Sequence, residues 1–376
     1  MQRGLSIFLD VLRFSAAIIV VLGHLTQSYF SEGWPDLTVY ALCAVSVFFV
    51  LSGFVIAFVV NTKERNARDY SIARISRLYS VLVPAIVLSG IVLLMGAHLD
   101  PAYMASWTGN KASLGFLASH PILRFAAQSL LSLLFLNSIH NHEAYPAMNS
   151  PVWSLSFEAA YYALFGIALF SRGWKRIGLI VVCCLLVGTG IIRLFPVWLL
   201  GVGLYYLVYR MRPTKQSQLT GVLCLALLVV AVFFWPDVYM WGMRPHGHWV
   251  DLAMHGTDRA QIAYLFYYSG IMTALVIYAA ASLESLLARL LTPAEKAIRW
   301  CADLTFSLYL FHFPLLVAIY VLTHYNRSSV TAKACALLAI LVSCWALSYI
   351  SEHKKYWWRQ QVRRIANTRK PTALST

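Results

Sequence analysis

Apolar segments of about the length that crosses a lipid bilayer recur along most of the chain, and no other sequence feature restricts the fold as strongly. A transmembrane helix needs about 17 to 25 mostly apolar residues. Segments near that length lie at 8–28, 38–60, 78–97, 152–171, 177–194, 196–210, 218–235, 262–282, 302–322 and 331–350. In lipid, backbone polar groups must be satisfied within such a segment, so each is expected to be helical. The sequence therefore predicts an all-α polytopic membrane protein with about ten transmembrane helices.

Composition agrees with this prediction. Of the 376 residues, 60% are hydrophobic and only 12% are charged, whereas soluble domains carry about 25% charged residues. The formal net charge of +15 is compatible with nucleic-acid binding, but the Lys and Arg residues cluster between and after the apolar segments. Cations in those places set topology and meet lipid headgroups. We therefore expect membrane lipids, and no nucleic acid, as partners of these residues.

The basic loops predict the topology. Residues 63–77, 172–176, 210–215 and 354–370 are rich in Lys and Arg and are expected to be cytoplasmic. An even number of crossings must then separate the first two loops. Spans 78–97 and 152–171 already supply two, so the apolar stretch 121–137 is predicted to be re-entrant or interfacial. Both termini are then cytoplasmic.

Two domain-level expectations follow. Residues 1–352 are expected to form one transmembrane domain, and 353–376 a basic cytoplasmic tail. The tail sequence HKKYWWRQQVRR mixes aromatic and cationic residues and predicts a helix on the inner leaflet, serving as lipid anchor and topology signal. The seven cysteines lie within or at the ends of apolar segments, so they are expected to be buried thiols without a disulfide framework.

Three polar groups interrupt the first apolar segment: Asp10, Arg13 and His24. Asp10 and Arg13 also argue against a cleaved signal peptide. On a helix, Arg13 and His24 are about 16.5 Å apart along the axis but only about 20° apart around it. One face therefore carries both side chains, which predicts a polar path into the protein.

Arg74 and Arg77 form a second polar group at the cytoplasmic end of the third span. They are expected at the same depth as Arg13, and three converging guanidiniums suit a phosphorylated ligand from the cytosol. The alternative is that both arginines only mark the inner side of the membrane.

Glu158 lies in NSPVWSLSFEAAYY (149–162), about two turns into a helix that enters from outside. Its expected depth is that of His24. A carboxylate beside an imidazole can fix its tautomer and raise its basicity, which is typical of a general base. The alternative is a structural glutamate paired with a cation or a hydroxyl.

The segment DLTFSLYLFHFPLL (303–316) places Ser307, Tyr309 and His312 in mid-membrane, and Pro314 frees a backbone carbonyl near His312. Taken alone, His312 is more typical of a packing residue than of a catalyst. No HxxxH or HExxH spacing occurs within one helix, so no metal is expected. An outward loop, 236–261, carries loosely spaced side chains that could bind zinc but are more typical of a solvated loop facing an acceptor: His246, His248, Asp251 and His255.

The motifs in their order resemble those of the acyltransferase 3 family of bacterial integral-membrane acyltransferases. The residues that carry the resemblance are LDVLRFSAAIIVVLGH (9–24), FFVLSGFVI (48–56), RISRLYSVLVP (74–84), NSPVWSLSFEAAYY (149–162) and SLYLFHFP (307–314). The resemblance implies a ten-span core in the bacterial inner membrane. It implies transfer of an acyl group, usually acetyl from acetyl-CoA, to a hydroxyl of a sugar in a cell-surface glycan or glycolipid; other members acylate macrolides or lipid-linked signals. The chain is expected to be a member without a fused periplasmic domain.

The resemblance also implies roles for residues of this sequence. Arg13 and His24 match the family's essential pair, Arg74 and Arg77 match its arginine motif, and Glu158 with the Tyr309–His312 segment matches later motifs. CoA's phosphates are then expected at Arg13, Arg74 and Arg77. His24, oriented by Glu158, is expected to act as general base or as acyl carrier. Tyr309, Ser307 or a backbone N–H near Pro314 are candidate oxyanion donors.

Two other function classes stay open at this point. A secondary transporter for a sugar or lipid, with His24 and Glu158 as a proton relay, predicts a repeat relating the two halves, and the sequence shows none. A lipid-modifying or regulatory membrane module predicts no need for the Arg13–His24 pair. The outward loop and residues 98–150 are where the family varies, so the acceptor and the acyl chain do not follow from the resemblance.

Overall fold

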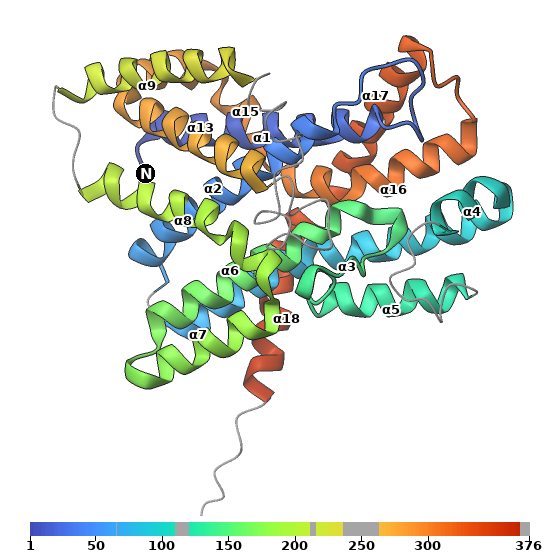
Figure 1. Ribbon diagram of the computed structural model, residues 1–376, viewed down its shortest axis with the longest axis horizontal. Coiled ribbons are helices and arrows are strands. Elements are labelled where there is room, and N and C mark those ends of the chain that lie inside the picture. The colour runs from blue at the N-terminus through green and yellow to red at the C-terminus, as the bar shows by residue number, and fades with distance from the viewer. Residues whose placement is uncertain (65, 110–119, 211–215, 236–262, 369–376) are drawn as a thin grey trace, which may run out of the picture. The chain divides into compact units, whose positions relative to one another are not determined.

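The computed structural model describes residues 1–64, 66–109, 120–210, 216–235 and 263–368 (Figure 1). Every regular element within these ranges is a helix, which confirms the all-α prediction. The chain forms two compact units, each discontinuous in sequence. Unit 1 comprises Met1–Lys63, Ile139–Asn141 and Cys184–Thr305, and unit 2 comprises Glu64–Ser138, His142–Cys183 and Phe306–Thr376.

Helices occupy all ten predicted segments, and eight helices of the described ranges are long and apolar enough to cross a membrane. These eight are α1 (Arg3–Leu25), α2 (Thr38–Thr62), α3 (Ala67–Leu99), α6 (Trp153–Phe170) with the preceding turn η3 (Ala147–Val152), α8 (Thr189–Arg210), α13 (Ala263–Ser282), α16 (Thr305–Thr323) and α17 (Val330–Ser348) with the residues after it. The other two are the shorter α7 (Gly173–Val187) and α9 (Gln216–Phe233). The chain is a multi-pass membrane protein; the count of ten crossings and the side of the termini stay predictions.

The apolar stretch 121–137 contains α5 (Pro121–Leu133), which has 13 residues. A helix of that length is about 20 Å long. The hydrocarbon core is about 30 Å thick, so α5 is too short for a full crossing. Its length supports the prediction of a re-entrant or interfacial segment.

The boundary predicted between 194 and 196 is wrong. The chain instead turns at Gly188, whose φ is +82°, between α7 and α8. A Cβ at this position would lie 2.8 Å from the backbone of His140, so glycine suits both the dihedral and the contact. Pro196 lies inside α8, and in the turn before it the carbonyl of Arg193 accepts a hydrogen bond from the Tyr267 hydroxyl.

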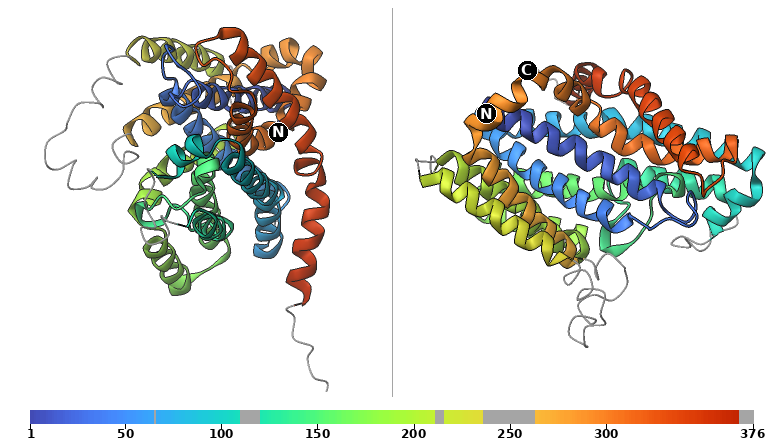
Figure 2. Two further views of the ribbon diagram at one scale, coloured as in Figure 1. Left: turned by 90° about the vertical axis from the view of Figure 1, so that its right-hand side faces the viewer. Right: turned by 90° about the horizontal axis from the view of Figure 1, so that it is seen from above.

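In unit 1, α2 packs against α1, α8 and α13, and α9 lies along α13 (Figures 1 and 2). The backbones of α2 and α8 touch where they cross. A Cβ at Gly53 would lie 2.1 Å from the Trp198 carbonyl oxygen, and one at Gly201 would lie 2.0 Å from the Val50 carbonyl oxygen. Small residues permit such close approach between membrane helices.

In unit 2, α3 is the longest described helix, with 33 residues. It runs antiparallel to the 149–170 segment: the Tyr70 ring packs on Gly166 near one end, and Ser89 Oγ accepts from Asn149 towards the other. Because α3 begins at Ala67 rather than at residue 78, the polar residues before the predicted span also belong to this helix pair.

The tail helix α18 (Lys355–Thr368) packs along the N-terminal half of α3 (Figure 2). Arg363 Nη2 lies 3.9 Å from Asp69 Oδ1, and Arg68 donates a hydrogen bond to Asn367. The tail therefore contributes to the same compact unit as α3. Its contact with lipid and the predicted division at residue 352 stay predictions.

The glycine contact between α2 and α8 gives a first prediction. Gly201→Ala should lower the free energy of unfolding by about 1–3 kcal/mol, because the new methyl group overlaps the Val50 carbonyl. Gly203→Ala, in the same helix but with no atom within 4 Å of its Cβ, should be neutral or stabilising. Thermal unfolding in detergent measures both. Equal effects of the two substitutions would contradict the packing described.

Candidate active site

The residues predicted to form the site divide between the two units. Arg13 and His24 belong to unit 1, whereas Arg74, Arg77, Glu158, Tyr309 and His312 belong to unit 2. The contacts of each group are described within its own unit. The predicted orientation of His24 by Glu158 joins residues of different units and stays a prediction.

Arg74 is buried and its charge is paired. Its Nη2 lies 2.6 Å from both carboxylate oxygens of Glu64, and each of the two residues is 7% exposed. The guanidinium also lies over the rings of Tyr70 and Tyr162, at 5.3 and 5.7 Å from their centroids. A buried guanidinium needs such a partner, because breaking a buried ion pair leaves an uncompensated charge.

Arg77, one turn further along α3, has a different environment. Its side chain is exposed and its guanidinium lies 5.9 Å from the centroid of the Phe306 ring. The carboxylates of Glu158 and Glu352 and the hydroxyl of Tyr162 lie within electrostatic range of it. Arg77 is therefore an accessible cation facing two carboxylates.

Glu158 is half-buried on α6 and accepts a hydrogen bond from the hydroxyl of Tyr162, one turn later. Tyr162 is fixed in turn, since its carbonyl accepts from the Tyr70 hydroxyl at 2.9 Å. Glu158 lies within electrostatic range of Arg77, so the two residues are closer together than their expected depths implied. The depth of each in the membrane stays a prediction.

Asn149 joins three segments of unit 2. It is fully buried, and its Nδ2 donates to the Leu310 carbonyl at 3.0 Å and to Ser89 Oγ at 3.2 Å. Leu310 precedes Pro314 by four residues, so its carbonyl is the one that lacks an intrahelical N–H partner. The prediction that Pro314 frees a carbonyl near His312 is confirmed, and Asn149 is the group that satisfies it.

Tyr309 and His312 also contact neighbouring backbone and side chains. The Tyr309 hydroxyl lies 2.7 Å from Ser154 Oγ and donates to the Pro151 carbonyl at 3.4 Å. His312 is fully buried, with Nδ1 2.9 Å from the Leu308 carbonyl oxygen. These contacts fix α16 against the start of α6, and a catalytic role for either residue stays a prediction.

Ser307 lies where the first turn of α16 meets the chain after α17. Its N–H donates to Glu352 Oε2 at 3.0 Å, and its Oγ lies 2.9 Å from Ser351 Oγ. A carboxylate at a helix N-terminus satisfies N–H groups that lack intrahelical acceptors. Glu352 thus connects the beginning of α16 to the surroundings of Arg77.

In unit 1, Arg13 and His24 lie on one unbroken helix, α1, as their shared face requires. Asp10 Oδ1 lies 3.6 Å from Arg13 Nη1, while its other oxygen lies 3.0 Å from Arg299 Nη1. His24 is half-buried in the last turn. Beside it, Thr26 Oγ1 accepts the Leu37 N–H at 3.0 Å, which fixes the corner between α1 and α2.

Several partners in these contacts were not identified from the sequence: Glu64, Asn149, Tyr162, Arg299 and Glu352. Only Pro314 gave a signal, because it implied an acceptor in need of a donor. Among the described residues no three His, Cys, Asp or Glu side chains are placed to hold a metal ion. The loop residues His246, His248, Asp251 and His255 lie outside the described residues, and the expectation of no metal stays a prediction.

Long apolar helices with arginine, histidine and glutamate along their lengths define a multi-pass membrane protein with a polar site. Residues 6–349 match the acyltransferase domain family (acyltransferase 3), and the chain belongs to that family. The family recognised from the sequence motifs is confirmed.

One curated relative is Acyltransferase MdmB of Streptomyces mycarofaciens, which is 26% identical over 160 residues. The match covers 41% of this chain and 36% of the relative, so the chain spans little more than a third of that relative's length. No solved structure matches the chain.

The Asn149 contact gives a second prediction. Asn149→Ala should lower the free energy of unfolding by about 1–3 kcal/mol, because the Leu310 carbonyl loses its buried donor. Adding Pro314→Ala supplies a backbone N–H to the same carbonyl, so the double variant should regain part of the loss. Denaturant unfolding of the two single variants and the double variant measures the coupling. Additive effects would contradict the assignment of this carbonyl to Asn149.

The buried pair gives a third prediction. Glu64→Gln should destabilise the protein by about 3–5 kcal/mol, because the Arg74 guanidinium is left buried without a counter-ion. Replacing both residues by methionine should recover most of that stability, since it removes both charges. The same unfolding measurement applies, and an unchanged stability of Glu64→Gln would show that Arg74 does not depend on Glu64.

Proposed function

We propose that this acyltransferase, in the bacterial inner membrane, moves acetyl from cytoplasmic acetyl-CoA to a hydroxyl of a cell-surface glycan or lipid-linked sugar. The observation that carries the proposal is the continuity of α1, which places Arg13 and His24 on one helix face. A cation for a phosphorylated donor and an imidazole for acyl transfer then lie about 16.5 Å apart along one axis. Membership in an acyltransferase family supports transfer chemistry over transport.

The donor is proposed to bind at the site of Arg13, Arg74 and Arg77, with Arg13 and Arg77 contacting its phosphates and Arg74 holding the helix turn in place. Guanidinium groups bind phosphate oxygens bidentately. Arg77 is the accessible member of its pair, and the donor phosphate takes the place of its neighbouring carboxylates. Arg74 stays paired with Glu64. It keeps this turn of α3 in a fixed geometry and does not bind the phosphate itself.

His24 is proposed to act on the acyl group. As a base it takes the proton of the acceptor hydroxyl while the oxygen attacks the thioester carbonyl; a C–O bond forms, the C–S bond breaks, and the proton passes to the CoA thiolate. As acyl carrier, its imidazole nitrogen attacks the thioester carbonyl, so that an N–C bond forms, the C–S bond breaks and CoA leaves as the thiol with the imidazole proton. The acceptor hydroxyl then attacks the acetyl-imidazole, so that the C–O bond forms, the N–C bond breaks and the hydroxyl proton returns to the imidazole. The negative end of the α1 dipole favours the imidazolium that the first route produces.

The remaining residues are proposed to support His24. Glu158 orients the imidazole, and its hydrogen bond from Tyr162 restricts the carboxylate to one conformation. Tyr309, Ser307 or a backbone N–H near Pro314 stabilises the oxyanion, and His312 lies on the same helix as these donors. No metal takes part in the proposal.

Two substitutions separate the proposed roles. His24→Ala should lower turnover by at least about 100-fold, since it removes the base or carrier, while CoA binding persists. Arg77→Ala should weaken CoA binding first. Release of CoA from radiolabelled acetyl-CoA, with and without cell-envelope glycans, measures turnover, and equilibrium binding of CoA measures affinity.

His98 provides a matched control, because it is an exposed histidine in the last turn of another apolar helix, α3. His98→Ala should behave as wild type. An active His24→Ala protein would refute the proposed role of His24.

A further inference from the structure

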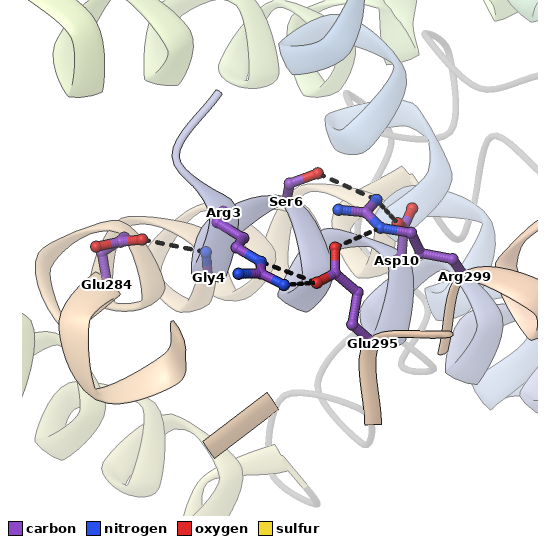
Figure 3. Close-up of polar contacts among 7 residues, drawn as sticks. All are labelled: Arg3, Gly4, Ser6, Asp10, Glu284, Glu295 and Arg299. Carbon is purple, nitrogen blue, oxygen red and sulfur yellow. Dashed lines mark hydrogen bonds and ion pairs between the residues drawn. The ribbon is translucent and has the colours of Figure 1, made fainter. Parts of the chain in front are cut away.

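In unit 1, α1 packs against two amphipathic helices, α14 (Glu284–Leu291) and α15 (Glu295–Ala302), and a row of alternating charges connects it with α15. Figure 3 shows most of this row as sticks. The first helix is buried against α14 at Gly4, where an added Cβ would lie 2.6 Å from the Glu284 carbonyl oxygen. The charged side chains of α15 therefore meet a helix face whose position is fixed by close backbone packing.

The charge row consists of Arg3, Glu295, Arg299, Asp10 and Arg13, in that order. Arg3 Nη2 lies 2.6 Å from Glu295 Oε2, and Arg299 Nε lies 2.9 Å from Glu295 Oε1 (Figure 3). Arg299 Nη1 then lies 3.0 Å from Asp10 Oδ2, and Asp10 Oδ1 lies 3.6 Å from Arg13 Nη1. Each carboxylate thus bridges two guanidiniums.

We propose that Asp10 is a positioning residue, which holds the Arg13 guanidinium in the orientation that receives a phosphate of the acyl donor. This inference rests on the proposed function, in which Arg13 binds acetyl-CoA. Asp10 acts through Arg13 and does not contact the donor. Arg299 fixes Asp10 from the opposite side.

The geometry around Asp10 suits that role. Its side chain is 16% exposed and that of Arg13 is 25% exposed, so the pair is partly screened from solvent. A flexible arginine side chain loses rotamer entropy when a ligand orders it. A carboxylate one turn earlier on the helix restricts the side chain before the ligand binds. At 3.6 Å the contact is an ion pair between the Asp10 carboxylate and the Arg13 guanidinium, one helical turn apart.

The rest of the row keeps Asp10 in place. Hydrogen bonds from Arg3 and Arg299 lower the pKa of Glu295, so this carboxylate remains ionised through the physiological range. Glu295 therefore keeps the Arg299 guanidinium near Asp10. Asp303 is the other acidic group within electrostatic range of Asp10.

Asp10→Asn in the full-length protein tests the proposal, because it preserves size and removes the charge. The KM for acetyl-CoA should rise by about tenfold with kcat within about twofold, as expected for the loss of one charge-assisted contact. The KM for acetyl-pantetheine, which lacks the nucleotide phosphates, should not change. Asp10→Glu should restore part of the affinity for acetyl-CoA.

Two further variants complete the experiment. Arg299→Met removes the anchor of Asp10 but keeps the Asp10 charge, so it should show the same donor-selective rise in KM to a smaller extent. Glu284→Gln is the matched control: Glu284 also faces α1 and accepts the Gly4 N–H at 3.1 Å, but it lies outside the charge row. Its KM should equal that of wild type.

The outcomes separate the two proposals. Equal increases in KM for both donors, or wild-type kinetics of Asp10→Asn with both, would overturn the positioning role while the proposed function stands. If the wild-type protein neither binds CoA nor releases it from acetyl-CoA, the proposed function fails, and with it the inference drawn from it.

Discussion

The buried amide of Asn149 is the contact on which the arrangement of unit 2 depends. Proline within α16 leaves the Leu310 carbonyl without a helical donor, and an apolar helix offers no water in its place. Asn149 supplies the donor and also contacts Ser89 of α3. One side chain thus fixes the register of three segments. Those segments carry Arg77, Glu158 and Tyr309, so their mutual placement follows from a residue that itself performs no chemistry.

The same constraint governs the charges. A guanidinium within a membrane protein is stable only beside a carboxylate, a ring or water. Arg74 has the first two, through Glu64 and the rings of Tyr70 and Tyr162. In unit 1 the arginines are stabilised by a chain of ion pairs, in which the carboxylates of Asp10 and Glu295 each contact two arginines. Charged residues that interrupt an apolar segment therefore indicate partners elsewhere in the chain, often far away in sequence.

The positions of the helices were predictable because apolar length alone identifies a membrane segment. The ends of the helices were less predictable, because hydropathy indicates which residues contact lipid and does not indicate how far the helical backbone continues beyond them. Thus α3 starts at Ala67, after the N-cap Asn66 whose side chain accepts the Asp69 N–H, and its first turns are polar. The motif residues of the site were found through resemblance to a family. Glu64 and Glu352 lie outside those motifs, and Asn149 lies within one of them (149–162) but was assigned no role. Nothing in the sequence shows which partner the fold brings to each of these polar residues.

The two arginines of the RISR motif show why such partners matter for function. They are one helical turn apart, so the sequence pattern predicts the same role for both. In the structure, however, Arg74 is buried and paired while Arg77 is exposed. A guanidinium already bound by both oxygens of a buried carboxylate cannot accept a phosphate without leaving that carboxylate unpaired, which is energetically unfavourable. An exposed guanidinium beside half-buried carboxylates exchanges partners at lower cost. Within this motif Arg77 is therefore the residue suited to a ligand that must bind and leave in each catalytic cycle. The buried Arg74–Glu64 pair fixes the turn of α3 that carries Arg77.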